Sequence, residues 1–179
     1  MAQAQLDLVE RFVNSVHMHD GRPDDEELGT PEALRAWLAE RSLMTSAESV
    51  SDGDLRRAID VREGLRALAL ANNGVELDSC AVERLDQAAG RASLRVQAVP
   101  GGLPQLAPDA RGVDGALATL LGIVATSVAD GSWERFKACP RDVCRWAFYD
   151  NSKNRSGRWC DMKTCGNVEK ARAYRERRS

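Results

Sequence analysis

The chain has 179 residues, of which 43% are hydrophobic and 5% aromatic, so it can bury an ordinary core and is not disordered by composition. The most apolar stretch, 116–129, is too short for a membrane span, and the N-terminus lacks the basic and apolar segments of a signal peptide. We therefore expect no membrane association and a cytoplasmic location, where clustered cysteines indicate a metal more than disulfides.

Charge is distributed unevenly along the chain. The net charge is −2, but from Trp133 to Ser179 Lys and Arg outnumber Asp and Glu by 13 to 6, which gives +7 there and −9 in the first 132 residues. A basic segment attached to an acidic one predicts that the basic part meets an acidic partner.

Apolar residues at helical spacing predict five helices before residue 131. Each has a recognisable start or stop signal, such as a Thr-Pro or Ser-x-x-Asp cap or an Asn-Asn-Gly end. The expected helices cover 4–18, a short segment after Thr30-Pro31, a segment from Ser51 to Asn72, a segment from Asp78, and 113–129.

A small β-hairpin is expected between the fourth and fifth helices, from residues 93–99 and 103–107. Composition changes after Asp130-Gly131, because four of the five cysteines and three of the four tryptophans fall in the last 47 residues. Such density is typical of a module too small for an ordinary core. We therefore expect a mainly α-helical domain over 1–131 and a small metal-bound module over 132–179.

Four cysteines of this module follow the spacing C-x4-C-x15-C-x4-C: Cys139, Cys144, Cys160 and Cys165. Two close pairs separated by a hairpin's length of chain can bring four thiolates to one tetrahedral point, which suits zinc. The closed shell leaves no position for water, so we expect one structural Zn²⁺ without catalysis. An iron–sulfur cluster and metal-free buried cysteines are the alternatives. Cys80 stands alone and is expected to be a small buried hydrophobe.

Residues 145–150 and 158–160 are expected to form two strands joined by a polar turn, and a helix should follow from Gly166-Asn167 to about Arg177. This order predicts a ββα finger of treble-clef or ribbon type. Its small core is expected to come from three aromatic residues placed between the ligands: Trp146, Phe148 and Trp159.

The last forty or so residues resemble the CGNR zinc finger, which pairs cysteines around a W-x-F-x-D segment, an N-R segment followed by R-W-C, and C-G-N-R. Besides the cysteines, the matching residues are Trp146, Phe148, Asp150, Asn154, Arg155, Trp159, Gly166 and Asn167. The N-terminal part resembles the ABATE domain that precedes this finger, through Phe12-Val13-Asn14-Ser15 and 28–43. The resemblance implies a stress-induced transcription regulator.

Two residues depart from the pattern of this family. Val168 stands where the arginine that gives the finger its name would be, and Gly157 lies in a stretch that tends to be more basic. Neither is a zinc ligand, and we expect both departures to weaken contacts with an anionic partner.

The last predicted helix segregates its charges, with basic residues and a tyrosine within about 80° of Asn167 and two glutamates opposite. Such a surface suits phosphates. The expected nucleic-acid-binding residues are Arg155, Arg158, Asn167, Lys170, Tyr174, Arg177 and Arg178. A protein-docking surface is one alternative. Another is a solvated helix end, where the helix dipole alone favours cations.

The sequence of the N-terminal domain says less about its function. We consider two hypotheses: the domain holds a sensor pocket that controls the finger, or it is a dimerisation scaffold. Asn14, His17 and Trp37 are the candidates for lining a ligand pocket, although surface histidines and a core tryptophan are the common case. We find no phosphate loop, no nucleophile motif with its base and no paired catalytic carboxylates, so we do not expect an enzyme.

These observations predict a zinc-binding transcription regulator that contacts DNA through its finger. It could act as a homodimer and respond to a small-molecule or protein signal. The alternative from another class is a zinc-stabilised protein–protein interaction module without DNA binding. A redox switch that releases zinc on oxidation is a third hypothesis.

Overall fold

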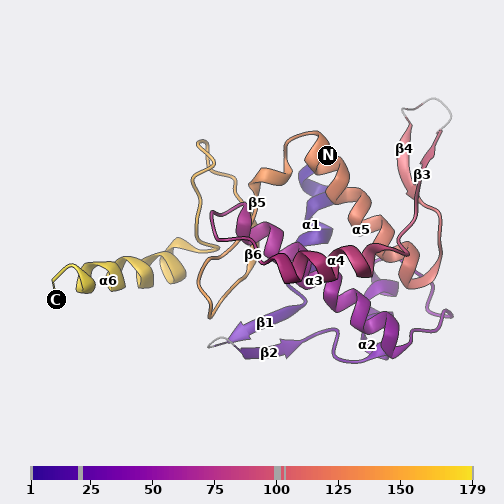
Figure 1. Ribbon diagram of the computed structural model, residues 1–179, viewed down its shortest axis with the longest axis horizontal. Coiled ribbons are helices and arrows are strands. Elements are labelled where there is room, and N and C mark those ends of the chain that lie inside the picture. The colour runs from indigo at the N-terminus through magenta and orange to yellow at the C-terminus, as the bar shows by residue number, and fades with distance from the viewer. Residues whose placement is uncertain (1, 20–21, 99–101, 103, 179) are drawn as a thin grey trace.

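The computed structural model describes residues 2–19, 22–98, 102 and 104–178. A helical body carries two projections, the hairpin β3–β4 and the C-terminal helix α6 (Figure 1). The helices are α1 Ala2–Val13, α2 Pro31–Glu40, α3 Asp52–Ala71, α4 Ser79–Ala89, α5 Gly112–Ala129 and α6 Asn167–Glu176. Three antiparallel strand pairs are β1 Val16–His19 with β2 Arg22–Glu26, β3 Leu94–Gln97 with β4 Gln105–Pro108, and β5 Phe136–Ala138 with β6 Ala147–Tyr149. The expected fold class, mainly helical and followed by a small cysteine-rich strand pair, is confirmed.

The predicted start signals form real caps. The Thr30 hydroxyl accepts a hydrogen bond from the backbone N–H of Ala33 at 3.2 Å, and Ser51 and Asp54 form a reciprocal capping box at the start of α3. The Asp78 carboxylate caps α4 in the same way. These side chains satisfy N–H groups that have no partner inside the helix, which fixes where each helix begins.

The first predicted helix, 4–18, is wrong over its last five residues, 14–18. Helix α1 ends at Val13, and Val16 begins β1, which pairs with β2 in the register Val16↔Glu26. Ser15 leaves the helix with its hydroxyl donating to the Phe12 carbonyl at 2.8 Å. Helical spacing could not exclude a strand at Val16, because a single apolar residue fits either period. The Asp20-Gly21 step between the strands, a frequent hairpin signal, lies outside the described residues.

One hydrophobic core joins α1, α2, α3, α4 and α5. Its largest fully buried side chains include Phe12, Leu38, Leu65, Leu117 and Phe136. The last of these belongs to β5, and Ala138 and Ala147 of the strand pair β5–β6 are buried in the same cluster. The first part of the cysteine-rich segment therefore completes the core of the helical body.

Two buried arginines of α3 hold the chain around the end of α1: Arg62 binds Glu26 of the hairpin β1–β2, and Arg66 binds the last residue of α1. The Arg62 guanidinium donates to both carboxylate oxygens of Glu26 at 2.7 Å each. Arg66 donates to the Val13 carbonyl and to Glu63. Burial alone would raise the pKa of Glu63, but the charges of Arg66 and Arg62 lower it below its usual value, so Glu63 is ionised at neutral pH.

Helix α5 is the one helix in the described part of the chain that is long and apolar enough to cross a membrane, with a mean hydropathy of 1.6 over 18 residues. About half of it, 44%, is buried within the molecule, and core helices pass the same test. The exposed part of α5 includes Ala125, Val128 and Ala129.

Cys80 is exposed at the start of α4, contrary to the prediction that it is buried. Helix α4 buries Ala81, Leu85 and Ala88. Cys80 precedes this stripe by one residue, which turns it about 100° away from the core.

Candidate functional site

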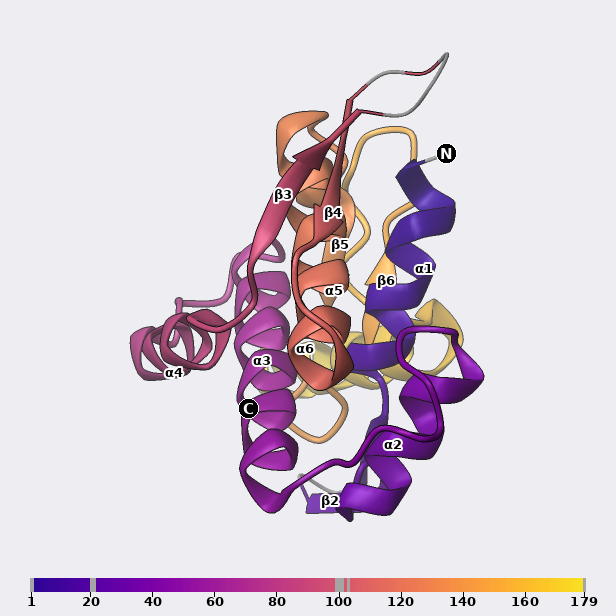
Figure 2. The same ribbon diagram turned by 90° about the vertical axis from the view of Figure 1, so that its right-hand side faces the viewer.

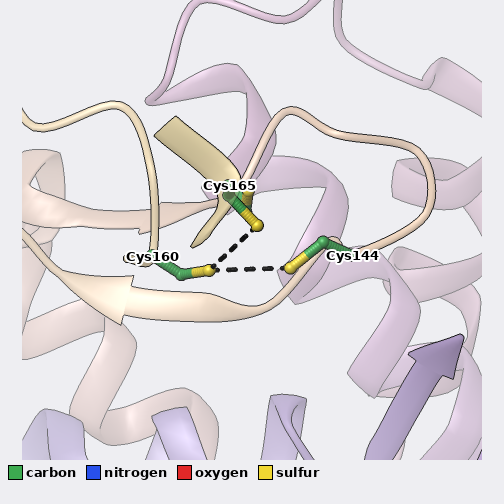
Figure 3. Close-up of side chains that lie close together, drawn as sticks. Cys144, Cys160 and Cys165 are labelled. Carbon is green, nitrogen blue, oxygen red and sulfur yellow. Dashed lines mark hydrogen bonds between the residues drawn. The ribbon is translucent and has the colours of Figure 1, made fainter. Parts of the chain in front are cut away.

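The four predicted ligands converge on one point. The sulfur atoms of Cys139, Cys144, Cys160 and Cys165 all lie within 4.8 Å of one another. Cys144 and Cys160 sulfurs are 3.6 Å apart and those of Cys160 and Cys165 3.8 Å apart, each pointing toward the others (Figure 3). A tetrahedral site with zinc–sulfur bonds of about 2.3 Å separates its sulfurs by about 3.8 Å. The four cysteines therefore fit one structural Zn²⁺.

The protonation of the sulfurs shows why a cation belongs there. Hydrogen bonds from Cys144 and Cys160 stabilise the Cys139 thiolate and lower its pKa to about 2. The same contacts with Cys139 raise the pKa of Cys144 to about 11 and also raise the pKa of Cys160. Four sulfurs this close cannot all be thiolates unless a positive charge offsets their repulsion, and Zn²⁺ supplies that charge.

The first cysteine pair lies in the loop that joins β5 to β6. The N–H of Cys139 donates to the Trp146 carbonyl at 2.9 Å, which extends the strand pair, and the N–H of Cys144 donates to the Arg141 carbonyl at 2.9 Å. The prediction that 145–150 pairs with 158–160 is wrong, because β6 pairs with β5 in the register Ala138↔Ala147.

The second pair begins the C-terminal helix. Cys165 lies in a π-helical turn, Met162–Gly166, which Asp161 caps by accepting from the N–H of Lys163 at 2.8 Å. Gly166 leaves room for Met162, because a Cβ at residue 166 would lie only 2.7 Å from the Met162 sulfur. Helix α6 follows directly, as predicted, so the metal site determines where this helix starts.

Arg141 ties the first cysteine loop to α6. Its Nη1 lies 3.5 Å from the Cys165 sulfur, and its Nε donates to Glu169 at 3.2 Å. Beyond this first turn α6 runs away from the body (Figure 1), and none of its described residues is buried. The helix is therefore held at its base only.

A buried ion pair between Lys137 and Asp150, which the sequence analysis missed, fixes the loop between the cysteine pairs. The Lys137 ammonium donates to Asp150 at 2.7 Å, to the Arg155 carbonyl at 2.7 Å and to the Gly157 carbonyl at 3.0 Å. Burial alone would raise the pKa of Asp150, but hydrogen bonds from Lys137 and Ser152 lower it to about 2. The pair is therefore ionised, and all three ammonium protons have acceptors.

Gly157 is placed against the Asp150 carboxylate. The N–H of Gly157 donates to Asp150 at 2.9 Å, and a Cβ at residue 157 would lie 2.6 Å from the other carboxylate oxygen. A basic side chain at this position would therefore require the loop to move. The departure from the family pattern noted in the sequence has a local steric reason.

Three asparagines of the body hold the backbone of the cysteine-rich segment. The Asn14 amide both donates to and accepts from Ala147, at 2.9 and 2.8 Å. Asn72 donates to the Trp133 and Phe136 carbonyls, both at 2.9 Å. Asn73 donates to the Ala138 carbonyl at 2.8 Å and the Arg158 carbonyl at 2.7 Å. The sequence analysis identified Asn72 and Asn73 only as a helix end.

The three residues predicted to line a ligand pocket lie in two places. Asn14 and His17 face the finger, where the His17 ring meets Trp146 edge-on at 4.9 Å. Trp37 is 4% exposed, packs against Phe12 and donates to the Glu27 carboxylate at 3.0 Å. The cavities found among the described residues, including one of about 610 Å³ between α2 and the start of α5, are lined by other side chains.

The predicted nucleic-acid residues of α6 are exposed. Lys170 and Arg177 make no ion pair with any described residue, and the Tyr174 hydroxyl accepts from Arg178 at 2.7 Å. The Asn167 amide donates back to the Lys163 carbonyl at 3.1 Å.

The two loop arginines are partly engaged. Arg155 pairs with Glu134 at 2.8 Å, and the Arg158 guanidinium lies 5.8 Å from the Trp159 ring centre. Exposed pairs of this kind are worth about 0–1 kcal/mol, so a phosphate can compete for either arginine. Val168, in place of the family arginine, is 46% exposed.

Comparison with protein families assigns both parts of the chain. Residues 6–131 match the model of the ABATE family, described as a putative stress-induced transcription regulator. Residues 135–178 match the model of the CGNR zinc finger. No curated protein matches the chain.

Proposed function

Because this chain belongs to the ABATE family and ends in a CGNR zinc finger, we propose that it is a transcription regulator that binds DNA through α6. In this proposal the zinc site orients the helix, and the helical body senses a signal or dimerises. The observation that supports it most is α6 itself, in which none of the described residues is buried and in which Lys170 and Tyr174 lie on one side with the following Arg177.

Because α6 is exposed to solvent and gains little stability from its own chain, a binding partner would stabilise it. A helix of 10 residues is marginal in water when nothing packs against it. Here its first turn is fixed by Cys165 and by the Arg141–Glu169 pair, and its last turns gain only surface pairs such as Arg172–Glu176 at 3.1 Å. A helix anchored at one end and open elsewhere can enter a groove without losing contacts to its own chain.

The size and charge of α6 suit the major groove of DNA. Ten residues span about 15 Å, and a B-DNA major groove about 12 Å wide admits a helix. Lys170 and Arg177 are free to meet phosphates, and Asn167 and Tyr174 lie on the same side. Four thiolates and one Zn²⁺ add −2, so the +7 of the segment becomes about +5.

Fluorescence anisotropy with zinc-loaded protein and a labelled duplex across a salt series would test the proposal. About five phosphate contacts predict a slope of log K against log salt near −4.5. The variant Lys170→Ala/Arg177→Ala should bind more weakly and with a slope smaller by about 1.8.

The matched control removes the same charge from the body, as Arg84→Ala/Arg91→Ala, and should leave the slope unchanged. Absence of binding at low salt would contradict the proposal. Equal weakening by both variants would contradict the assignment to α6.

A protein partner is the second candidate function, because Met162 and Val168 expose apolar side chains at the base of α6, 47% and 46%. Basic helices with an apolar neighbour also suit acidic proteins. This alternative predicts that nuclease-treated lysate yields a stoichiometric protein partner, and that Val168→Asp abolishes its capture.

A further inference from the structure

The molecule exposes more surface than its mass requires. Its accessible surface is 10627 Å², whereas a compact monomer of this mass exposes about 8,600 Å². The surplus of about 2,000 Å² reflects its two projections, α6 and the hairpin β3–β4, which stand at opposite ends of the long axis (Figure 1). The DNA proposal uses the first and leaves the second without a role.

The hairpin β3–β4 has one apolar face, most of which is open to solvent. Leu94 pairs with Pro108 and Val96 with Leu106, and alternation along the strands puts all four on the same face. At the inner end Leu94 is half-buried and lies close to Gly122 of α5, whereas its partner Pro108 is exposed. The outer pair is open to solvent, with Val96 71% and Leu106 44% exposed.

A groove of about 410 Å³ lies beneath this face, between the hairpin, α5 and the start of α1. Figure 2 shows β3 and β4 running alongside α5. Its walls include Leu94, Leu106 and Ile123, and no described residue that lines it is charged. The hydroxyls of Thr119 and Thr126 donate to carbonyls of their own helix at 2.9 and 2.8 Å, so the groove presents few unsatisfied donors.

The last turns of α5 add a second open apolar surface. Val128 is 58% exposed and Ala125 and Ala129 are exposed beside it. The molecule thus exposes two apolar surfaces, one at the outer end of the hairpin β3–β4 and one at the end of α5.

We propose that the β3–β4 hairpin and the outer face of α5 form a homodimer interface, in which Val96 and Leu106 of each copy pack against α5 of the other. Two complementary surfaces on one molecule satisfy the requirement of a twofold contact, since each copy gives and receives the same element. A standard interface takes about 800 Å² from each partner, which the surplus surface can supply.

Charge restricts the face through which a second copy can approach. The first 132 residues carry −9, so two bodies repel each other wherever charged surfaces meet. No described residue that lines the groove is charged, so a contact through it avoids this repulsion. Arg95 and Asp109 of the hairpin pair with each other at 3.4 Å, and Arg95 lies on the opposite face from Val96, where it stays in water.

The dimer does not depend on DNA binding, because α6 lies at the far end of the molecule from the hairpin (Figure 1). Loss of the dimer and loss of DNA binding can therefore be distinguished in the same protein. A dimer made in this way leaves both zinc fingers open to a partner.

Sedimentation equilibrium of the full-length, zinc-loaded protein over about 1–100 µM would test the interface. We expect a dimer that Val96→Asp/Leu106→Asp weakens by at least about tenfold in Kd, with zinc content and circular dichroism unchanged. Leu77→Asp is the matched control, because Leu77 is 45% exposed outside the groove, and it should leave the dimer intact.

A wild-type protein that stays monomeric across this range would overturn the proposal. So would a dimer that survives the double substitution, or one that the Leu77 control disrupts equally. Fluorescence anisotropy with the labelled duplex, measured on the same variants, shows whether the finger still binds DNA when the dimer is lost.

Discussion

The helical body and the zinc finger of this protein are ordered by different means. The body is acidic and buries apolar side chains from five helices, so no single contact dominates it. The outer part of the finger is basic and has almost no apolar interior. It depends on four sulfurs, one buried ion pair and the amide of Asn73, which donates to the Arg158 carbonyl. Where a core is too small, a few polar contacts of defined geometry replace it.

The strand pair β5–β6 belongs to both regions. Phe136, Ala138 and Ala147 lie in the core of the body, while the loop between the strands carries Cys139 and Cys144. The contrast between the regions is therefore sharpest in residues 150–178, and substitutions there should separate the two kinds of order.

The largest effect is expected from the metal. Cys160→Ser should abolish stoichiometric zinc binding, because structural zinc contributes about 10–16 kcal/mol in small modules. Hydrogen exchange should then become fast in 150–178, whereas α3 stays protected by the core. Elemental analysis and exchange mass spectrometry would measure both.

Cys80→Ser is the control for this substitution, since Cys80 is exposed and does not belong to the cluster. It should retain one zinc per chain and native exchange. A Cys160→Ser protein with full zinc content and an unchanged finger would show that the metal does not organise the segment.

Removing the buried cation should have the next largest effect. Lys137→Ala leaves the Asp150 carboxylate buried without its partner, and breaking a buried pair in this way costs about 3–5 kcal/mol. Urea unfolding of the zinc-loaded protein would measure the loss. Lys153→Ala, an exposed lysine of the same loop, should change stability by less than about 0.5 kcal/mol, and equal effects would refute a specific role for Lys137.

The smallest of the three effects is expected at the contact between the regions. Asn73→Ala removes the donor to the Ala138 and Arg158 carbonyls, and an unsatisfied buried group costs about 1–3 kcal/mol. Exchange should rise around β5 and Arg158 and stay native in α1. Asn154→Ala, at an exposed position, is the control. Uniform destabilisation of both regions would mean that they do not open separately.

The features that the sequence predicted correctly are local. Caps such as Thr30 and Asp78 lie within three residues of the groups they satisfy, so a short stretch of sequence is enough to predict where each helix begins. The four cysteines are spread further, but zinc accepts few ligand types and the paired spacing is distinctive. The helices after residue 30 and the metal cluster were therefore predicted from the sequence.

The features it missed depend on distant partners. Asn14 bonds a residue 133 positions away, and no periodicity reports such a contact. The partner of β6 was predicted wrongly for the same reason, because β5 is selected by Phe136 and Ala138 entering a core built from other helices. Lys137 resembled an ordinary surface lysine, and only the folded loop shows three acceptors around it.

The sharing of β5 between the core and the cysteine loop bears on how such proteins recombine. A gene fragment that starts after residue 131 would carry Phe136 and the Trp133 ring stacked on it, but not the residues of the body that complete the core around them. Grafted onto another protein, that finger would arrive with an uncovered apolar surface. A graft of this finger should therefore include the part of the body that covers Phe136, whereas substitutions on the exposed face of α6 leave that core unchanged.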